Sequence, residues 1–342
     1  MRDVFLVIAI AFLIFLSVFI LKAIAPSLFP FYFVYIAVGI VTFLIFSKVG
    51  FEVTSIFSKH FYIFSIFLLI LTLIIGRVTR GAVRWIPIGA FTVQAAEIVR
   101  PFLLLFFAVF LTQKSVSLKR FLIALVLLAI PSLLILIQPS LGVTVLTVIG
   151  FLGVMLASKF DKKYILWGIL GMLVLLPIVW LVMAPYQRGR VVTFLDPASD
   201  PLGAGYNSLQ STISVGSGKL TGMGLGRGIQ TQLSFLPEKQ TDFVFAAVAE
   251  ELGFTGVILM LMAIFVVLYR LTVYMENVVS PTARAYVSGL FLTLLAQVFT
   301  HVGMNLGMLP ITGLPFPLVS AGGSSFLATM IGLGIAVGAY KK

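Results

Sequence analysis

Long apolar runs, separated by short polar segments, follow one another along the whole chain. A helix of about 20 residues crosses the roughly 30 Å hydrocarbon core of a bilayer, and ten runs reach or approach that length. The pattern therefore predicts an all-α polytopic membrane protein with about ten transmembrane helices. The predicted spans are Val4–Leu21, Phe29–Ile45, Phe61–Ile75, Gln94–Leu111, Phe121–Ile137, Leu141–Leu156, Tyr164–Ala184, Phe243–Tyr269, Ala285–Met304 and Val319–Tyr340.

The segments between these runs are unequal on the two sides of the membrane. On one side they are short, whereas on the other they hold most of the unusual residues, at Gly76–Val93, Arg188–Thr241 and Gly307–Ser320. Because no linker or low-complexity tract interrupts the chain, residues 1–342 are expected to form a single integral membrane domain. The loop at about residues 188–241, between the seventh and eighth spans, is its largest, and chemistry is expected on this face.

Composition and charge agree with this interpretation and fix the orientation. Hydrophobic residues make up 61% of the chain and cysteine is absent, which excludes disulfides, thiolate nucleophiles and Cys-ligated metals. If the N-terminus is cytoplasmic, that side holds 13 of the 23 Lys and Arg residues and only four acidic ones. The positive-inside rule therefore predicts that both termini are cytoplasmic and the longer segments face outward. The net charge of +12 reflects topology and a local site rather than a nucleic-acid surface.

Four arginines cluster near one another on the outer side, where positive charge is not expected. Arg77, Arg80 and Arg84 follow the third span, and Arg100 begins the fourth. A guanidinium binds phosphate oxygens in a bidentate manner and keeps its charge in a partly dry site, which points to a phosphorylated lipid as ligand. Ordinary binding to anionic membrane lipids is the alternative. Glu97 shares a helix face with Arg100, and this pair either makes insertion tolerable or takes part in binding.

Asp242 is the leading candidate for catalysis. It lies in a carboxylate-bearing stretch that leads directly into an apolar run. An ionisable group near hydrocarbon loses hydration and is a functional candidate by default. The alternative is that its carboxylate only caps free N–H groups at the start of a helix. Glu250 and Glu251 lie about 12 Å further along that helix and are expected to be structural.

A glycine-rich segment runs from Gly216 to Gly228. It lacks the spacing and the context of a phosphate-binding loop. Its glycines are expected to allow positive φ angles and a close approach of the backbone to the membrane surface or a ligand. Lys219 and Arg227, within the segment, are candidates for contact with an anionic headgroup.

Prolines and glycines are frequent again between Leu309 and Ser325. They predict an irregular segment, which is tolerated at membrane depth only if it is buried in protein or lines a wet cavity. His301 and Asn305 precede this segment and share a helix face. We expect them to be a pair of buried hydrogen-bonding groups rather than a metal site.

These segments resemble the SEDS family (shape, elongation, division and sporulation), polytopic membrane proteins typified by RodA and FtsW. The resemblance covers roughly Gly76 to Gly334 and is closer to RodA at Asp196–Tyr206 and Gln230–Glu238. The segments that carry it are Gly81-Ala-Val-Arg-Trp85, Pro185-Tyr-Gln-Arg188, Asp196-Pro-Ala-Ser-Asp-Pro-Leu-Gly-Ala-Gly-Tyr206, Gln210-Ser211, Leu236-Pro-Glu-Lys-Gln-Thr-Asp-Phe243, Ala249-Glu-Glu-Leu-Gly253 and Leu318-Val-Ser-Ala-Gly-Gly-Ser324.

The resemblance implies a peptidoglycan glycosyltransferase that polymerises lipid II on the outer face of the bacterial cytoplasmic membrane, together with a class B penicillin-binding protein. It places the family's essential aspartate at Asp242, its acidic residue at Glu97, and its Arg-Trp pair at Arg84 and Trp85. Trp85 is either an interfacial anchor or a stacking partner for a sugar. The further candidates for binding lipid II or the undecaprenyl-linked glycan strand are Arg100, Arg77, Arg80, Lys219, Arg227 and Lys239.

The chain departs from the family's motifs at several positions. Ala95 and Ala96 replace Pro-Ser, Arg100 replaces a lysine, Ser140 replaces an aspartate and Ala321 replaces a tyrosine. Ser140 removes a carboxylate from an outer turn and puts in doubt a divalent-ion site that uses this acid. We predict no metal ligands, while Mg²⁺ or Mn²⁺ stays open as a cofactor.

Two other functions are kept as alternatives. In a lipid II flippase, the arginines and Glu97 would line a translocation path, although few polar groups lie inside the predicted spans. In a non-catalytic scaffold, helix contacts would activate a penicillin-binding protein instead.

Overall fold

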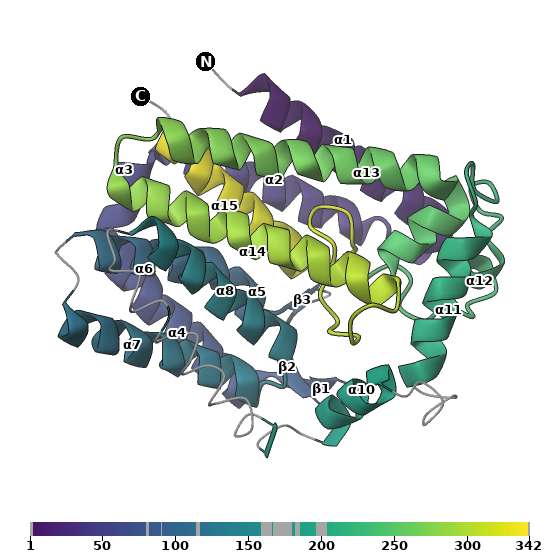
Figure 1. Cartoon of the computed structure of the whole chain (residues 1–342), viewed down its shortest axis with the longest axis horizontal. Helices are drawn as coiled ribbons and strands as arrows, with labels where there is room; N and C mark the ends of the chain where they lie inside the picture. The colour runs from purple at the N-terminus through teal and green to yellow at the C-terminus, as the bar shows by residue number, and fades with distance from the viewer. Residues whose placement is uncertain are drawn as a thin grey trace. The chain divides into compact units, whose positions relative to one another are not determined.

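The protein is seen in a computed structural model that describes residues 3–79, 82–89, 91–113, 117–158, 166, 180–181, 185–195 and 204–340 (Figure 1). Among these residues, eight helical segments are long and apolar enough to cross a membrane. They are α1 (Val4–Ile24), α2 (Phe31–Val49), α4 (Ser58–Ile75), α5 (Ala95–Ile98) joined to α6 (Arg100–Thr112), α7 (Leu118–Ile137), α13 (Val244–Asn277), α14 (Pro281–Asn305) and α15 (Gly323–Tyr340).

The predicted helical membrane fold is confirmed. Helix α8 (Leu141–Ala157) is apolar but shorter, so the described residues place a helix at nine of the ten predicted spans. The remaining predicted span, Tyr164–Ala184, lies almost entirely outside the described residues.

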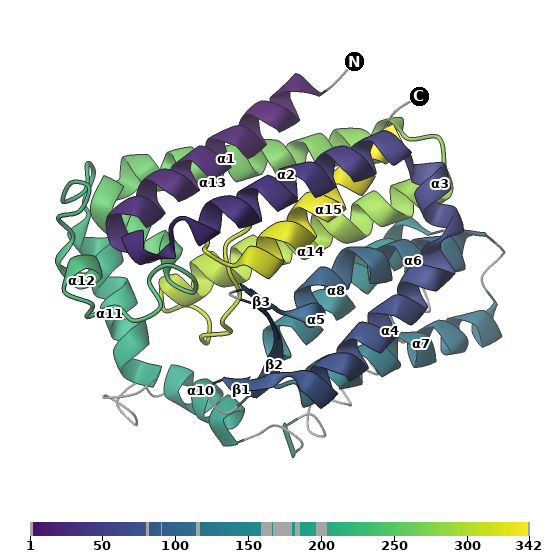
Figure 2. The same ribbon diagram turned by 180° about the vertical axis from the view of Figure 1, so that it is seen from behind.

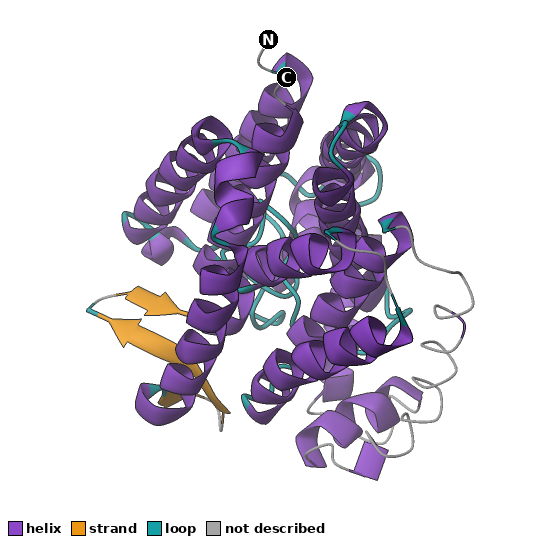
Figure 3. Cartoon of the chain, turned by 90° about the vertical axis from the view of Figure 1, so that its left-hand side faces the viewer, coloured by secondary structure: helices purple, strands orange, loops and turns teal. Residues whose placement is uncertain are grey.

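The outer segments contain more regular structure than the sequence predicted. Short helices there and elsewhere are η1 (Pro26–Leu28), α3 (Phe51–Ile56), α10 (Pro185–Leu195), α11 (Ala204–Ser217) and α12 (Ile229–Gln232). The segment Gly76–Val93 forms an antiparallel three-stranded sheet of β1 (Arg77–Thr79), β2 (Ala82–Ile88) and β3 (Phe91–Val93) (Figure 3). Two of these strands have only three residues, too few for an alternating pattern to be recognised.

The chain divides into two compact units. The first unit contains Met1–Phe29, Lys162–Val267 and Gln297–Ala321, and the second contains Pro30–Asp161, Leu268–Ala296 and Gly322–Lys342. In the second unit α2 packs along α15, while α4, α6, α7 and α8 pack against one another (Figure 2). Helix α6 is buried along nearly its whole length, whereas α2 and α4 keep exposed apolar side chains that suit contact with lipid. The single membrane domain over residues 1–342 stays a prediction.

In the first unit, α13 is interrupted at Gly253, where φ is 67° and ψ is −165°. The glycine-rich segment packs against this break: the N–H groups of Met223 and Gly224 donate to the carbonyls of Glu250 and Glu251 at 2.8 and 3.1 Å. The expected positive φ angles are present at Gly222, Gly224 and Gly226. The close backbone approach is also present, but its partner is the backbone of α13. An approach of this segment to a membrane surface or a ligand stays a prediction.

Glu250 and Glu251 have the structural role that the sequence predicted. Both are fully buried. Glu250 accepts hydrogen bonds from the N–H groups of Gln230 and Thr231 at 2.8 and 2.9 Å, and Glu251 accepts from the N–H of Gly226. Glu251 therefore holds the end of the glycine-rich segment against α13, and Glu250 holds α12, which follows that segment.

Three glycine substitutions test this packing. Gly222 has a φ of +83°, and a Cβ there would lie 2.2 Å from the carbonyl oxygen of Glu251; Gly226 has a φ of +71° but open space around it. Gly216 has neither constraint. Gly226→Ala is expected to lower the free energy of unfolding by about 1–2 kcal/mol, the cost of a left-handed residue. Gly222→Ala should cost more, and Gly216→Ala should cost little.

The measurement is the thermal unfolding midpoint of each purified variant in detergent. Equal midpoints for Gly222→Ala and Gly216→Ala would contradict the packing described here.

Candidate active site

Asp242 lies on a turn in which three backbone N–H groups donate to the same carbonyl oxygen. The N–H groups of Thr241 and Asp242 both donate to the carbonyl oxygen of Glu238 at 3.0 Å, and Phe243 does so at 3.3 Å. The Thr241 hydroxyl also donates to the Glu238 carboxylate at 3.1 Å. Because α13 begins only at Val244, Asp242 stands on this turn just before the helix, and it is partly exposed.

Apolar side chains on both sides of the turn hold it in place. Leu236 and Phe243 are buried in one cluster with Ala246, and Val215 and Ile311 pack against that cluster. The turn is thus anchored at both ends, which leaves Asp242 between two buried positions.

The irregular outer segment packs onto the other side of the same turn. The Ser320 hydroxyl donates to the carbonyl of Thr241 at 2.7 Å, and the Ala321 N–H donates to the carbonyl of Gln240 at 2.8 Å. No helix forms after Asn305 until Gly323, so the predicted irregular segment is confirmed. Sequence reasoning did not foresee that its serine would contact the turn of Asp242.

His301 and Asn305 form the predicted pair of buried hydrogen-bonding groups. Both are fully buried, and Nδ1 of His301 lies 2.7 Å from the carbonyl oxygen of Leu314. Asn305 Nδ2 donates to the carbonyl of Asp242 at 3.0 Å. The spacing of the pair in the sequence signalled burial, but it gave no indication of the contact with Asp242.

The basic candidates of the first unit lie on or near the glycine-rich segment. Lys219 and Arg227 are exposed there. The ammonium group of Lys239 donates to the carbonyl of Thr231. Burial lowers the pKa of Lys239, and the carboxylates of Glu251 and Glu250 oppose that shift. Lys239 is therefore tied to the segment that the two carboxylates hold, and its role in substrate binding stays a prediction.

In the second unit, Glu97 and Arg100 form the ion pair that their spacing predicted. Arg100 Nη2 lies 2.7 Å from Glu97 Oε2, and the two side chains are only 5% and 3% exposed. Arg100 begins α6, and Glu97 lies in the preceding short helix α5. At this burial each charge depends strongly on the other.

Gln94 is hydrogen-bonded to two segments that are distant from it in the sequence. Its N–H donates to the Ser324 hydroxyl at 2.8 Å, and its side-chain amide donates to the Ser140 hydroxyl at 3.0 Å. Ser140, where the family has an acid, thus makes a neutral buried hydrogen bond. In the part of the chain that the structure describes, no three His, Asp or Glu side chains are placed to hold a metal ion.

The Arg-Trp pair lies on β2, and both side chains are partly buried. Trp85 is paired in register with Arg77 of β1, while Arg80 lies outside the described residues. Strand β3 leads through Gln94 directly into α5. The sheet therefore connects Arg84 and Trp85 to the segment that carries the ion pair.

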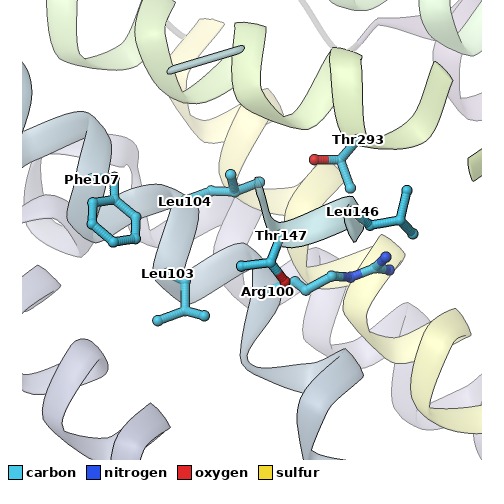
Figure 4. A pocket seen from close by; sticks show the side chains of 7 residues that line it. All are labelled: Arg100, Leu103, Leu104, Phe107, Leu146, Thr147 and Thr293. Carbon is cyan, nitrogen blue, oxygen red and sulfur yellow. The ribbon is translucent and has the colours of Figure 1, made fainter. Parts of the chain in front are cut away.

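A small cavity lies beside Arg100 (Figure 4). Its volume is about 10 Å³, and its lining is otherwise mostly apolar: Leu103, Leu104, Phe107, Leu146, Thr147 and Thr293. This is room for about one water molecule. The cavity is too small for a sugar, so it is not the substrate site.

The structure thus gathers the candidates into two groups. Asp242, Lys219, Arg227 and Lys239 belong to the first unit, and Arg77, Arg84, Trp85, Glu97 and Arg100 belong to the second.

The buried ion pair gives a testable prediction about stability. Arg100→Leu is expected to destabilise the protein by about 3–5 kcal/mol, because it leaves the Glu97 carboxylate buried without its cation. Glu97→Leu should have a similar effect, because it leaves the Arg100 guanidinium buried without its anion. The double variant removes both charges and should recover much of either loss. The thermal midpoints of the four proteins form a double-mutant cycle, and strictly additive losses would contradict the coupling.

Comparisons with known proteins identify the family. The FtsW, RodA and SpoVE family, described as cell cycle proteins, matches residues 2–342. Peptidoglycan glycosyltransferase MrdB of Escherichia coli (strain K12) is 40% identical over 304 residues, covering 88% of this chain and 82% of that protein. The probable peptidoglycan glycosyltransferase FtsW of Idiomarina loihiensis is 34% identical over 290 residues, covering 81% of this chain and 69% of that protein.

Solved structures agree with the family match. A chain from a peptidoglycan synthase complex, studied for the coordination of polymerization and crosslinking, has a TM-score of 0.85 and 30% identity over 99% of this chain and 97% of its own. The rod shape determining protein RodA of Thermus thermophilus has a TM-score of 0.75 and 25% identity over 99% and 96%. Since the family match spans nearly the whole sequence, this chain belongs to the FtsW, RodA and SpoVE family, the SEDS proteins.

Proposed function

We propose that this protein is a peptidoglycan glycosyltransferase that polymerises lipid II into glycan strands on the outer face of the bacterial cytoplasmic membrane. The observation that carries the proposal is the position of Asp242, on a turn held by hydrogen bonds at the start of α13. A relative 40% identical to this chain is named a peptidoglycan glycosyltransferase. A carboxylate whose main chain is held next to an apolar helix suits a base that acts on a lipid-linked substrate.

Asp242 is the general base in this mechanism. It accepts the proton from the C4 hydroxyl of the acceptor's N-acetylglucosamine as that oxygen attacks the anomeric carbon of the donor. A new C–O bond forms while the bond to undecaprenyl pyrophosphate breaks, and the pyrophosphate leaves with the electron pair. The α linkage of the donor becomes β in one inverting displacement, so no covalent enzyme intermediate is needed. Such a base contributes about 10²–10⁴-fold to the rate.

The arginines stabilise the charge that grows on the departing pyrophosphate. Guanidinium groups suit this role because they remain charged and bind phosphate oxygens in a bidentate manner. Arg84 and Arg100 are the main candidates, with Arg77 and Arg80 beside them in the sequence. Glu97 pairs with Arg100 and orients its guanidinium.

The proposal includes a membrane orientation and a partner. Both termini are cytoplasmic, because the short loops that carry most of the Lys and Arg residues then lie inside. A class B penicillin-binding protein is the partner, which the match to a chain from a peptidoglycan synthase complex supports. Participation of Mg²⁺ or Mn²⁺ stays a prediction.

The test is polymerisation of purified lipid II in detergent by the wild type, Asp242→Ala and the control Glu276→Ala, each with and without a transpeptidase-dead class B partner. Glu276 is an exposed acid near the end of α13. The wild type and the control are expected to make glycan chains. Asp242→Ala should be at least about 100-fold slower, because it lacks the base, while staying folded and lipid-binding.

Each other outcome has a defined meaning. Full polymerisation by Asp242→Ala would remove the aspartate from the mechanism. No chains from the wild type, with folded protein and an active control enzyme, would contradict the enzyme assignment and favour a flippase. Equal amounts of chains from the wild type and Asp242→Ala, made only when the partner is present, would place the polymerising activity in the partner and favour a scaffold.

A further inference from the structure

The side chain of Asn305 lies between two backbone groups at the start of α13. Its Nδ2 donates to the carbonyl oxygen of Asp242 at 3.0 Å, and its Oδ1 accepts from the N–H of Ala246 at 3.1 Å. These two groups are four residues apart, which is the pair that an α-helix would join directly. The carboxamide of Asn305 thus occupies the place of a helical hydrogen bond.

A direct bond between these two groups would start α13 at Phe243, whereas the helix begins at Val244. The first backbone bond of α13 runs from the N–H of Ala247 to the carbonyl of Phe243 at 3.0 Å. Asp242 is therefore kept on the turn that Glu238 closes and is not drawn into the first turn of the helix. Its backbone geometry depends on a residue 63 positions away in the sequence.

Asn305 is itself held firmly enough to impose this geometry. It is fully buried, and its second amide proton goes to the carbonyl of His301 at 2.8 Å. The backbone carbonyl of Asn305 accepts a hydrogen bond from the Ser211 hydroxyl of α11 at 2.9 Å. His301 is in turn bonded to Leu314. Both protons of the amide and its oxygen are used, so the group cannot rotate without losing a buried hydrogen bond.

We propose that Asn305 is a positioning residue for Asp242, an inference that rests on the proposed function of Asp242 as general base. The amide keeps the carbonyl of Asp242 and the N–H of Ala246 apart. Without the amide, the two groups can bond to each other and extend α13 by one residue, which shifts Asp242. A base displaced by about 1 Å can lose about 100-fold in rate.

The proposal predicts a particular kinetic pattern. Asn305→Ala is expected to lower kcat of lipid II polymerisation by about 10- to 100-fold and to change KM less than threefold, because it misplaces the base without removing a substrate contact. The matched control is Asn277→Ala, which truncates an exposed asparagine whose amide bonds to the carbonyl of Val273 at 2.7 Å. It should leave both constants unchanged.

A second variant covers the case in which Asn305→Ala does not fold. Asn305→Asp keeps the shape of the side chain, but a carboxyl group offers at most one proton where the amide donates two. Its kcat should also fall at least tenfold. Folding is checked for each variant by its thermal midpoint and by a single symmetric peak in size-exclusion chromatography.

The outcomes separate this inference from the function on which it rests. Chains from the wild type, none from Asp242→Ala and a kcat within threefold of wild type for a folded Asn305 variant would overturn the role of Asn305 alone. A rise in KM above tenfold with unchanged kcat would also overturn it, because that pattern belongs to substrate binding. Polymerisation by Asp242→Ala would instead overturn the proposed base, whatever the Asn305 variants do.

Discussion

Every polar group that lies among apolar side chains in this protein needs a partner within the protein itself, because hydrocarbon offers none. In the first unit, the two buried carboxylates of Glu250 and Glu251 meet this need for the glycine-rich segment. Each anion is surrounded by N–H donors, which lowers the cost of burying it. The interruption of α13 at Gly253 provides the space for this packing. Along the chain, the turn of Asp242 lies between the glycine-rich segment and α13, which these carboxylates connect.

The second unit satisfies the same requirement with neutral groups around Gln94. The hydroxyl of Ser140 accepts from the Gln94 amide, and a neutral hydroxyl needs no counter-ion at this depth. Because a neutral serine stands at position 140 in place of the family's aspartate, this position holds no buried charge that needs a partner. Ala321 also departs from the family, but its contact with Gln240 is made by its backbone N–H. That contact does not depend on the identity of the side chain.

The sequence was sufficient for features that depend on local pattern. Apolar length predicted the helices, and spacing along a helix predicted both the Glu97–Arg100 ion pair and the burial of His301 with Asn305. It was insufficient where a contact joins distant segments. Nothing near Asn305 indicates that its amide bonds to Asp242, because that contact exists only once α13 and α14 have packed. The glycines of residues 216–228 likewise indicated a close approach without naming α13 as the partner.

The main-chain hydrogen bonds of Asp242 are compatible with the proposed role of its side chain as a base. Here the contacts with Glu238 and Asn305 are made to the main chain of Asp242. Backbone hydrogen bonds keep their strength when the side chain is protonated. If Asp242 is the base proposed above, the turn keeps it in one place through both halves of a proton transfer.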